Sequence, residues 1–110
     1  MSKHVTHWIN GQEWSGTAAR HGDIYNPATG QVTGTVDFAT SAVMDQAVAS
    51  SKAAFAEWRH ASLARRGQVL FAFRELLNAK KEDLAAIITA EHGKVLSDAL
   101  GEVTRGLEVV

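Results

Sequence analysis

The sequence contains no cysteine, only one proline and no long apolar run. Without cysteine, its 110 residues can form no disulfide, no thiolate zinc site and no cysteine nucleophile. No segment approaches the roughly 18 continuous apolar residues of a membrane span, and the start lacks the apolar core of a signal peptide. We therefore expect a soluble protein, cytoplasmic or of the matrix type, that has no membrane partner.

Neither sign of charge is in excess, because 11 Lys and Arg nearly balance 12 Asp and Glu. No long-range field then attracts nucleic acid or an anionic surface, so we expect no nucleic-acid partner. The five histidines are His4, His7, His21, His60 and His92. Only His4 and His7 are close in sequence, in what we expect to be an amino-terminal tail, so we predict no metal site.

Turn signals dominate the first third of the chain. Trp8–Trp14 contains Asn-Gly between two apolar ends, which predicts a hairpin with a type I′ turn. Asn26–Gly30 predicts a second turn, followed by a strand around Val32–Val36. Gly34 lies inside that strand and indicates a bulge or a close approach of another backbone.

Helical spacing of apolar residues begins after Phe38. Thr40 or Ser41 is a candidate N-cap for the first helix, and a break near 60–62 separates it from a second. A third helix is predicted from about Lys81 to Glu91, with Gly93 as its C′ residue. The predicted inward stripes are Met44, Ala47, Val48, Ala54, Phe55 and Trp58; Val69, Leu70, Phe73, Leu76 and Leu77; and Leu84, Ile87 and Ile88.

A fourth helix is predicted from near Val95, with an apolar stripe at Leu96, Leu100, Val103, Leu107 and Val110. Its pattern reaches Val110 without a capping signal, so we expect the segment to be truncated there.

The order of these patterns, strands first and helices after, predicts an α+β fragment in which a hairpin and short strands precede three to four helices. We expect a strand region at 1–38 and a helical region at 39–110. The apolar content of 45% is enough for a modest core. Trp8, Trp14 and Trp58 are assigned to hairpin and core packing.

Three blocks, in this order and spacing, resemble the aldehyde dehydrogenase family. Trp8–Trp14 (WINGQEW) is similar to the family's INGEW hairpin, and Asn26–Gly30 (NPATG) resembles its NPATG turn, followed by a helix ending in Phe55–Trp58 (FAEW). Glu91–Lys94 (EHGK) resembles the E-x-G-K segment. The resemblance covers almost the whole chain and implies an α/β enzyme with a Rossmann-like NAD-binding domain, whose helical part would include 39–110.

The last helix suggests a branch of the family. Gly101–Val110 (GEVTRGLEVV) is similar to a run in methylmalonate-semialdehyde dehydrogenases. In that branch the resemblance implies NAD-dependent oxidation of malonate or methylmalonate semialdehyde, decarboxylation, and transfer of the acyl group from a cysteine thioester to coenzyme A. It also implies a homo-oligomer in the full-length form.

Arg105 is the candidate site residue, because the arginine of this run is associated with the substrate carboxylate in the branch. A planar guanidinium can hold a carboxylate through two parallel hydrogen bonds. The alternative is an exposed ion pair with Glu102, three residues earlier on the same helix face, which also carries Asp98.

The segment itself is predicted to be inactive and to bind no cofactor, because it has no cysteine, no Gly-rich phosphate loop and no recognisable nicotinamide site. No catalytic residue is assigned. Two other hypotheses stay open: a segment of an ordinary NAD(P)-dependent aldehyde dehydrogenase, and a non-enzymatic truncated paralogue acting as an interaction module.

Overall fold

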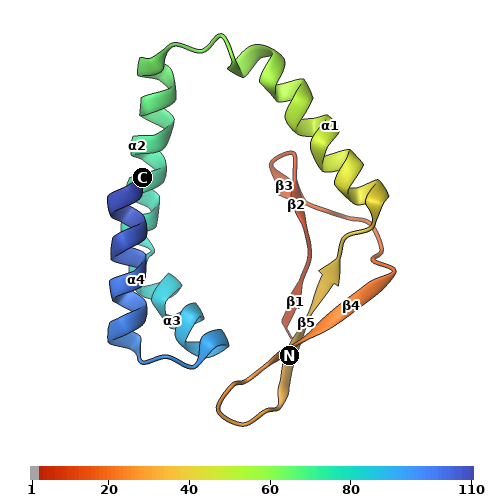
Figure 1. Cartoon of the computed structure of the whole chain (residues 1–110), viewed down its shortest axis with the longest axis vertical. Coiled ribbons are helices and arrows are strands. Elements are labelled where there is room, and N and C mark those ends of the chain that lie inside the picture. The colour runs from red at the N-terminus through yellow and green to blue at the C-terminus, as the bar shows by residue number, and fades with distance from the viewer. Residues whose placement is uncertain (1–2) are drawn as a thin grey trace. The chain divides into compact units, whose positions relative to one another are not determined.

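Strands occupy the first third of the chain and helices the rest, as the order of the sequence patterns predicts (Figure 1). The structure, a computed structural model, describes residues 3–110. Its strands are β1 (Lys3–Val5), β2 (Trp8–Ile9), β3 (Gln12–Glu13), β4 (Arg20–Tyr25) and β5 (Val32–Phe38). Its helices are α1 (Ser41–Trp58), α2 (Leu63–Ala79), α3 (Lys81–His92) and α4 (Leu96–Val109).

The chain divides into two compact units. One comprises the residues up to Tyr25 together with Gln31–His60, and therefore holds all the strands and α1. The other comprises Asn26–Gly30 and Ala61–Val110, and holds the loop between β4 and β5 with α2, α3 and α4. The change from strand to helix falls between Phe38 and Ser41.

The predicted hairpin at Trp8–Trp14 is confirmed. β2 and β3 pair antiparallel, with Ile9 opposite Gln12. Asn10 and Gly11 have φ values of 55° and 76°, the positive angles that a type I′ turn requires at both central positions. The local Asn-Gly signal was sufficient here because the turn forms from its own backbone.

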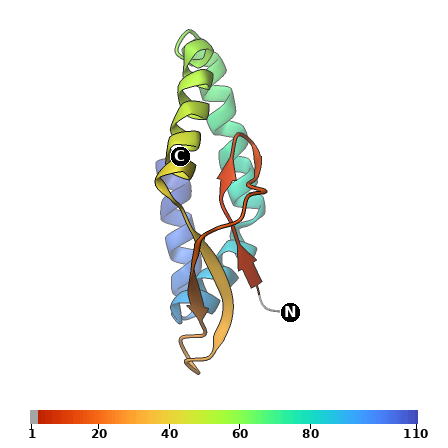
Figure 2. The same cartoon turned by 90° about the vertical axis from the view of Figure 1, so that its right-hand side faces the viewer.

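β1, β5 and β4 form a three-stranded sheet in that order, with β5 in the centre. β4 and β5 pair antiparallel in a long twisted ribbon, which Figure 2 shows in brown to orange-yellow, while β1 pairs parallel to β5. His4 therefore lies in a strand opposite Thr35 and not in a tail, which corrects the expectation for the amino terminus. Pairing with β5 supplies partners for the backbone that a tail would leave to water.

Gly34 lies beside a bulge and also at a close approach of another backbone, the two features that a glycine inside a strand can indicate. The register between β4 and β5 shifts between Ile24 and Tyr25, so a bulge lies beside Gly34. A Cβ at Gly34 would lie 2.4 Å from the carbonyl oxygen of Lys3. The missing side chain thus lets β1 approach β5.

The Asn26–Gly30 loop is held by its own backbone and by Asn26. The Asn26 side-chain oxygen accepts a hydrogen bond from the Ala28 N–H at 2.9 Å, and the Asn26 carbonyl accepts one from the Gly30 N–H at 2.8 Å. Gly30 has a φ of 70°. The Pro27 ring lies against Gly93, where a Cβ would come within 3.1 Å of the Pro27 Cγ atom.

The starts of α1 and α2 and the end of α3 follow local capping signals. Thr40 caps α1, since its hydroxyl accepts a hydrogen bond from the Val43 N–H. Ser62 caps α2 in the same way through the Arg65 N–H. α3 ends at His92, and Gly93 follows with a φ of 87°, as expected of a C′ glycine.

Burial is much lower than the apolar content predicts. Among residues 3–110 the buried hydrophobic residues are Val43, Ala85, Ala99 and Leu107. Of the residues assigned to inward stripes, Phe55 is 58% exposed and Leu76 is 66% exposed, and Trp8 is 70% exposed. The expectation of a modest core is therefore wrong for this segment alone, although the spacing of the stripes is helical. Trp8 and Trp58 are exposed, whereas Trp14 beside the hairpin is half-buried, with its ring centroid 5.2 Å from that of His7.

α3 and α4 pack against each other with small residues in the contact (Figure 1). Ala85 on α3 and Ala99 on α4 are both fully buried, and Leu107, about two turns farther along α4, is also buried. Small side chains allow two helix axes to approach closely. This packing fixes which face of α4 is left outside.

Candidate functional site

The outer face of α4 carries a polar hollow of about 370 Å³. Asp98, Glu102 and Arg105 lie on this face together, as helical periodicity predicts from their spacing. The hollow is lined by Lys94, Ser97, Asp98, Gly101, Glu102 and Arg105. Arg105, the site residue predicted from the sequence, therefore borders a hollow that is lined by both positively and negatively charged side chains.

Lys94 and Glu102 form the ion pair of this hollow. The Lys94 ammonium group donates a hydrogen bond to the Glu102 carboxylate. Lys94 belongs to the connection before α4, whereas Glu102 lies in the second turn of the helix. The pair therefore ties the connection to the helix.

The pKa of the Glu102 carboxyl is lowered. The hydrogen bond from Lys94 is the largest cause, and partial burial opposes it. The positive charges of Lys94, His92 and Arg105 lower the pKa further. Glu102 is therefore ionised at neutral pH and is surrounded by cationic groups.

Arg105 lies near Glu102 on the rim of the hollow, and its positive charge reaches the Glu102 carboxylate through space. The hydrogen bond and the ion pair of that carboxylate go to Lys94. Arg105 and Glu102 thus interact through their charges, while the Glu102 carboxylate accepts its hydrogen bond from Lys94. A guanidinium carries parallel donors that can hold an anion.

Sequence reasoning overlooked Lys94 as part of this site. The residue was visible in the Glu91–Lys94 segment, but it lies eight positions before Glu102 and outside the helix, so no helical spacing connects the two. Only the turn at Gly93 brings them together. His92 lies in the last turn of α3.

A second polar cluster lies on the strands. The buried Asp37 carboxylate of β5 is 2.8 Å from His21 Nδ1 and 3.3 Å from His4 Nε2. The pKa of Asp37 is lowered, chiefly by the neighbouring Thr6 side chain, then by the hydrogen bond with His21 and by the charges of His4 and His21, against the effect of burial. Among residues 3–110, no group of three or more His, Cys, Asp or Glu is arranged to hold a metal ion.

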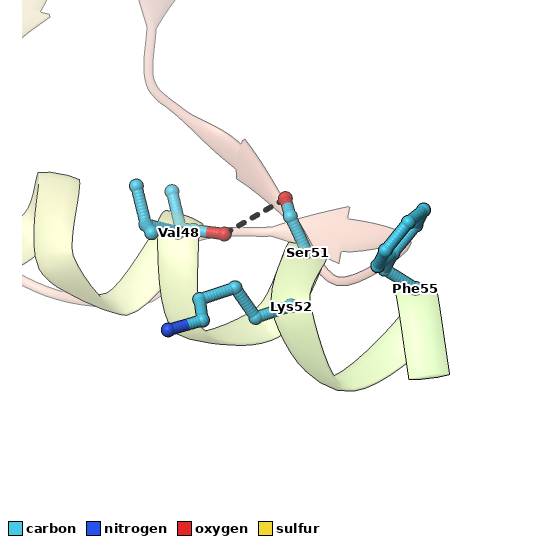
Figure 3. A pocket seen from close by; sticks show the side chains of 5 residues that line it. Val48, Ser51, Lys52 and Phe55 are labelled. Atoms are coloured by element: carbon cyan, nitrogen blue, oxygen red, sulfur yellow. Dashed lines mark hydrogen bonds between the residues drawn. The ribbon is translucent and has the colours of Figure 1, made fainter. Parts of the chain in front are cut away.

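Two further hollows are apolar. One lies along α1 and is lined by Ala47, Val48, Ser51, Lys52 and Phe55; Figure 3 shows the Ser51 hydroxyl turned back onto its own helix, where it donates to the Ala47 carbonyl. Another, of about 400 Å³, is lined by Phe73, Leu77, Leu84, Ile87, Ile88, Val103, Gly106 and Val110. Neither presents convergent polar groups that could orient a substrate. No helix among residues 3–110 is long and apolar enough to span a bilayer.

Comparison with known proteins identifies the family. A sequence profile described as the aldehyde dehydrogenase family matches residues 14–110. The chain belongs to this family. Aldehyde dehydrogenases with solved structures match it over their amino-terminal part, which confirms the α+β segment of a larger fold that the sequence predicts.

The similar aldehyde dehydrogenases include semialdehyde enzymes. The chain is 44% identical over 106 residues to malonate-semialdehyde dehydrogenase of Listeria monocytogenes, covering 96% of this chain and 22% of the relative. A Sinorhizobium meliloti structure, described as a methylmalonate-semialdehyde dehydrogenase in complex with NAD, matches with a TM-score of 0.94 and 43% identity over 99% of this chain and 22% of that one.

A methylmalonate-semialdehyde dehydrogenase structure from Oceanimonas doudoroffii matches with a TM-score of 0.92 and 36% identity, covering 98% of this chain and 22% of that one. The chain thus spans about a fifth of the length of the aldehyde dehydrogenases it matches.

The described residues do not fit NAD, the cofactor of this aldehyde dehydrogenase class. In residues 3–110 the one direct passage from a strand into a helix is Phe38 to Ser41, and it contains no glycine. The hydroxyl of Thr40 there already accepts the Val43 N–H. A dinucleotide cradle needs a Gly-rich turn that exposes helix N–H groups to a pyrophosphate.

Proposed function

We propose that the chain is the amino-terminal segment of an NAD-dependent, CoA-acylating malonate- or methylmalonate-semialdehyde dehydrogenase, in which Arg105 binds the substrate carboxylate. The observation that carries the proposal is the position of Arg105, which borders a polar hollow where the neighbouring Glu102 carboxylate is bound to Lys94. The similarity to enzymes whose substrates bear a carboxylate supports it.

The reacting groups of such an enzyme would lie outside this segment. The oxidation requires a thiolate nucleophile, and the chain has no cysteine. NAD and coenzyme A would therefore bind to other parts of the longer protein, which we place in the cytoplasm as a homo-oligomer. The role of this segment is structural, apart from the charge of Arg105.

A first experiment assays the 110-residue chain alone. We expect no NADH formation from malonate semialdehyde in the presence of NAD and coenzyme A, because neither the nucleophile nor the cofactor cradle is present. NADH production above a protein-free blank would refute the assignment of a structural role.

A second experiment tests Arg105 in a hybrid enzyme, in which this chain replaces the matching segment of the Listeria protein. The 44% identity makes the exchange reasonable. We expect Arg105→Gln to reduce kcat/KM for malonate semialdehyde about 10- to 100-fold, because a charge-assisted hydrogen bond is lost, and to leave propanal oxidation nearly unchanged. Arg105→Lys should give an intermediate loss, since an ammonium cannot form the bidentate contact.

The matched control is Arg74→Gln, which removes an exposed arginine that pairs with Glu75 on α2. This variant should leave kcat/KM for both aldehydes unchanged. An equal effect of Arg105→Gln on both aldehydes would contradict carboxylate binding. No effect on either would favour the ordinary aldehyde dehydrogenase, where Arg105 is a surface residue.

A further inference from the structure

Glu102 is the carboxylate that would pair with Arg105 on an isolated helix. The two residues are three positions apart on α4, a spacing at which oppositely charged side chains meet. In the structure the Glu102 carboxylate is bound to Lys94 instead. Lys94 comes from outside the helix, so the fold overrides the local preference.

Lys94 is held where it can compete for Glu102. It follows Gly93, whose left-handed φ of 87° ends α3, and the Pro27 ring lies against that glycine. The Lys94 side chain is 22% exposed, compared with 43% for Glu102. A side chain that is partly immobilised by its surroundings loses less entropy when it forms an ion pair.

We infer that Lys94 is a positioning residue, which binds Glu102 and thereby keeps the guanidinium of Arg105 available to the carboxylate of a substrate. The inference rests on the proposed role of Arg105. Asp98 also borders the hollow, four positions before Glu102, and it adds negative charge near the site. His92 adds positive charge near Glu102.

The physical argument is competition within the molecule. Without Lys94, the Glu102 carboxylate would be free to turn toward Arg105, and a group on the same helix has a high effective concentration. The carboxylate of a substrate would have to displace it. Neutralising Glu102 would remove the competitor. If Lys94 only positions Glu102, this change should restore anion binding in a variant without Lys94. If Lys94 binds the anion directly, it should not.

The experiment uses the 110-residue chain at a protein concentration low enough for the chain to be monomeric. Propanoate is titrated while NMR follows the Nε–Hε signal of Arg105, with propanamide as the uncharged control ligand. We expect Lys94→Met to weaken propanoate binding roughly two- to fivefold and Lys94→Met/Glu102→Gln to restore it. Lys80→Met, which removes a different surface ion pair, should have no effect.

A second measurement keeps the inference testable if the segment alone binds propanoate too weakly. NMR titration of the Glu102 carboxyl is carried out with and without Arg105→Gln. We expect Arg105→Gln to raise the Glu102 pKa more in the Lys94→Met background than in the wild type, because only then does Glu102 contact Arg105.

The outcomes separate the two proposals. Equal weakening of propanoate binding by Lys94→Met and by the double variant would overturn the inference, because Lys94 would then bind the anion itself. The inference would also be overturned if Arg105→Gln changed the Glu102 pKa equally in the wild type and in the Lys94→Met variant. A third outcome is that propanoate binding does not depend on Arg105, while Arg105→Gln changes the Glu102 pKa more in the Lys94→Met variant than in the wild type. This outcome would leave the positioning role intact and count against the proposed function of Arg105. Circular dichroism verifies that each variant is folded.

Discussion

At the scale of single residues, the structure pairs charges that the sequence does not connect. Asp37 on β5 binds His21 on β4 and His4 on β1, so one buried carboxylate joins three strands. These residues are far apart in sequence, and only the sheet order brings them together. The same is true of Lys94 and Glu102, which the turn at Gly93 brings within reach of each other.

Asp37 should make the stability of the compact unit that holds the strands and α1 depend on pH. Its folded pKa lies below the ordinary value of 3.8, so the ionised form stabilises the fold above that value, and this stability is lost as the pH falls through the folded pKa. Urea unfolding between about pH 7 and pH 2, followed by tryptophan fluorescence, measures the loss. Trp8, Trp14 and Trp58 all belong to this unit.

Asp37→Asn is the informative variant. It should be less stable than the wild type at neutral pH and should lose the part of the acid dependence due to Asp37, because Asn cannot ionise. Glu102→Gln serves as the control, since the Glu102 pKa is also lowered but the residue belongs to the other unit. Identical acid profiles for Asp37→Asn and the wild type would contradict the assignment.

At the scale of elements, the ends of helices follow from a few neighbouring residues. The sequence predicts Thr40 or Ser41 as the cap of α1, and the structure selects Thr40. It also predicts Gly93 as the residue after α3, and the left-handed angle there confirms it. Capping bonds form within one turn of the chain, so a short window of sequence contains the information that determines them.

Thr40→Ala should destabilise α1 by about 1 kcal/mol, because the Val43 N–H loses its side-chain acceptor. Thr40→Asp should keep most of the stability, since a carboxylate also accepts from the first turn. Urea unfolding monitored by circular dichroism measures the difference. Ser41→Ala, one position into the helix, is the matched control and should be nearly neutral; equal stability of Thr40→Ala and Ser41→Ala would show that the cap contributes nothing.

At the scale of the whole molecule, the apolar surface exceeds what the segment can bury. Exposed large side chains include Leu63 at 80%, Phe71 at 71% and Leu76 at 66%. The spacing of the predicted stripes, to which Leu76 belongs, was interpreted correctly as helical. Their burial was not, because a stripe shows that a face is apolar without showing what covers it. In the longer enzyme proposed above, other parts of the protein would cover these faces.

The isolated chain should therefore self-associate. Light scattering over a range of protein concentrations should show a mean mass that rises with concentration, since large exposed apolar patches promote association. Phe71→Glu places a charge on one such face and should reduce the association, whereas Lys52→Glu on α1 alters charge without removing an apolar group. A monomer at every concentration would instead support the self-contained interaction module.

The sequence by itself determined the order of strands and helices, the two turns, the glycine after α3, the family and the helix face that carries Arg105. These depend on backbone preferences and periodicity within a few residues, so local sequence is sufficient. The sequence left Thr40 and Ser41 open as the cap of α1 and did not identify Ser62 as the cap of α2. Only the tertiary structure decided that β1 joins β5 and that Lys94 binds Glu102 in place of Arg105. It also decided that most of the apolar stripes stay exposed. Each of these depends on which distant groups the folded chain brings together, and this is not fixed by any single stretch of the sequence.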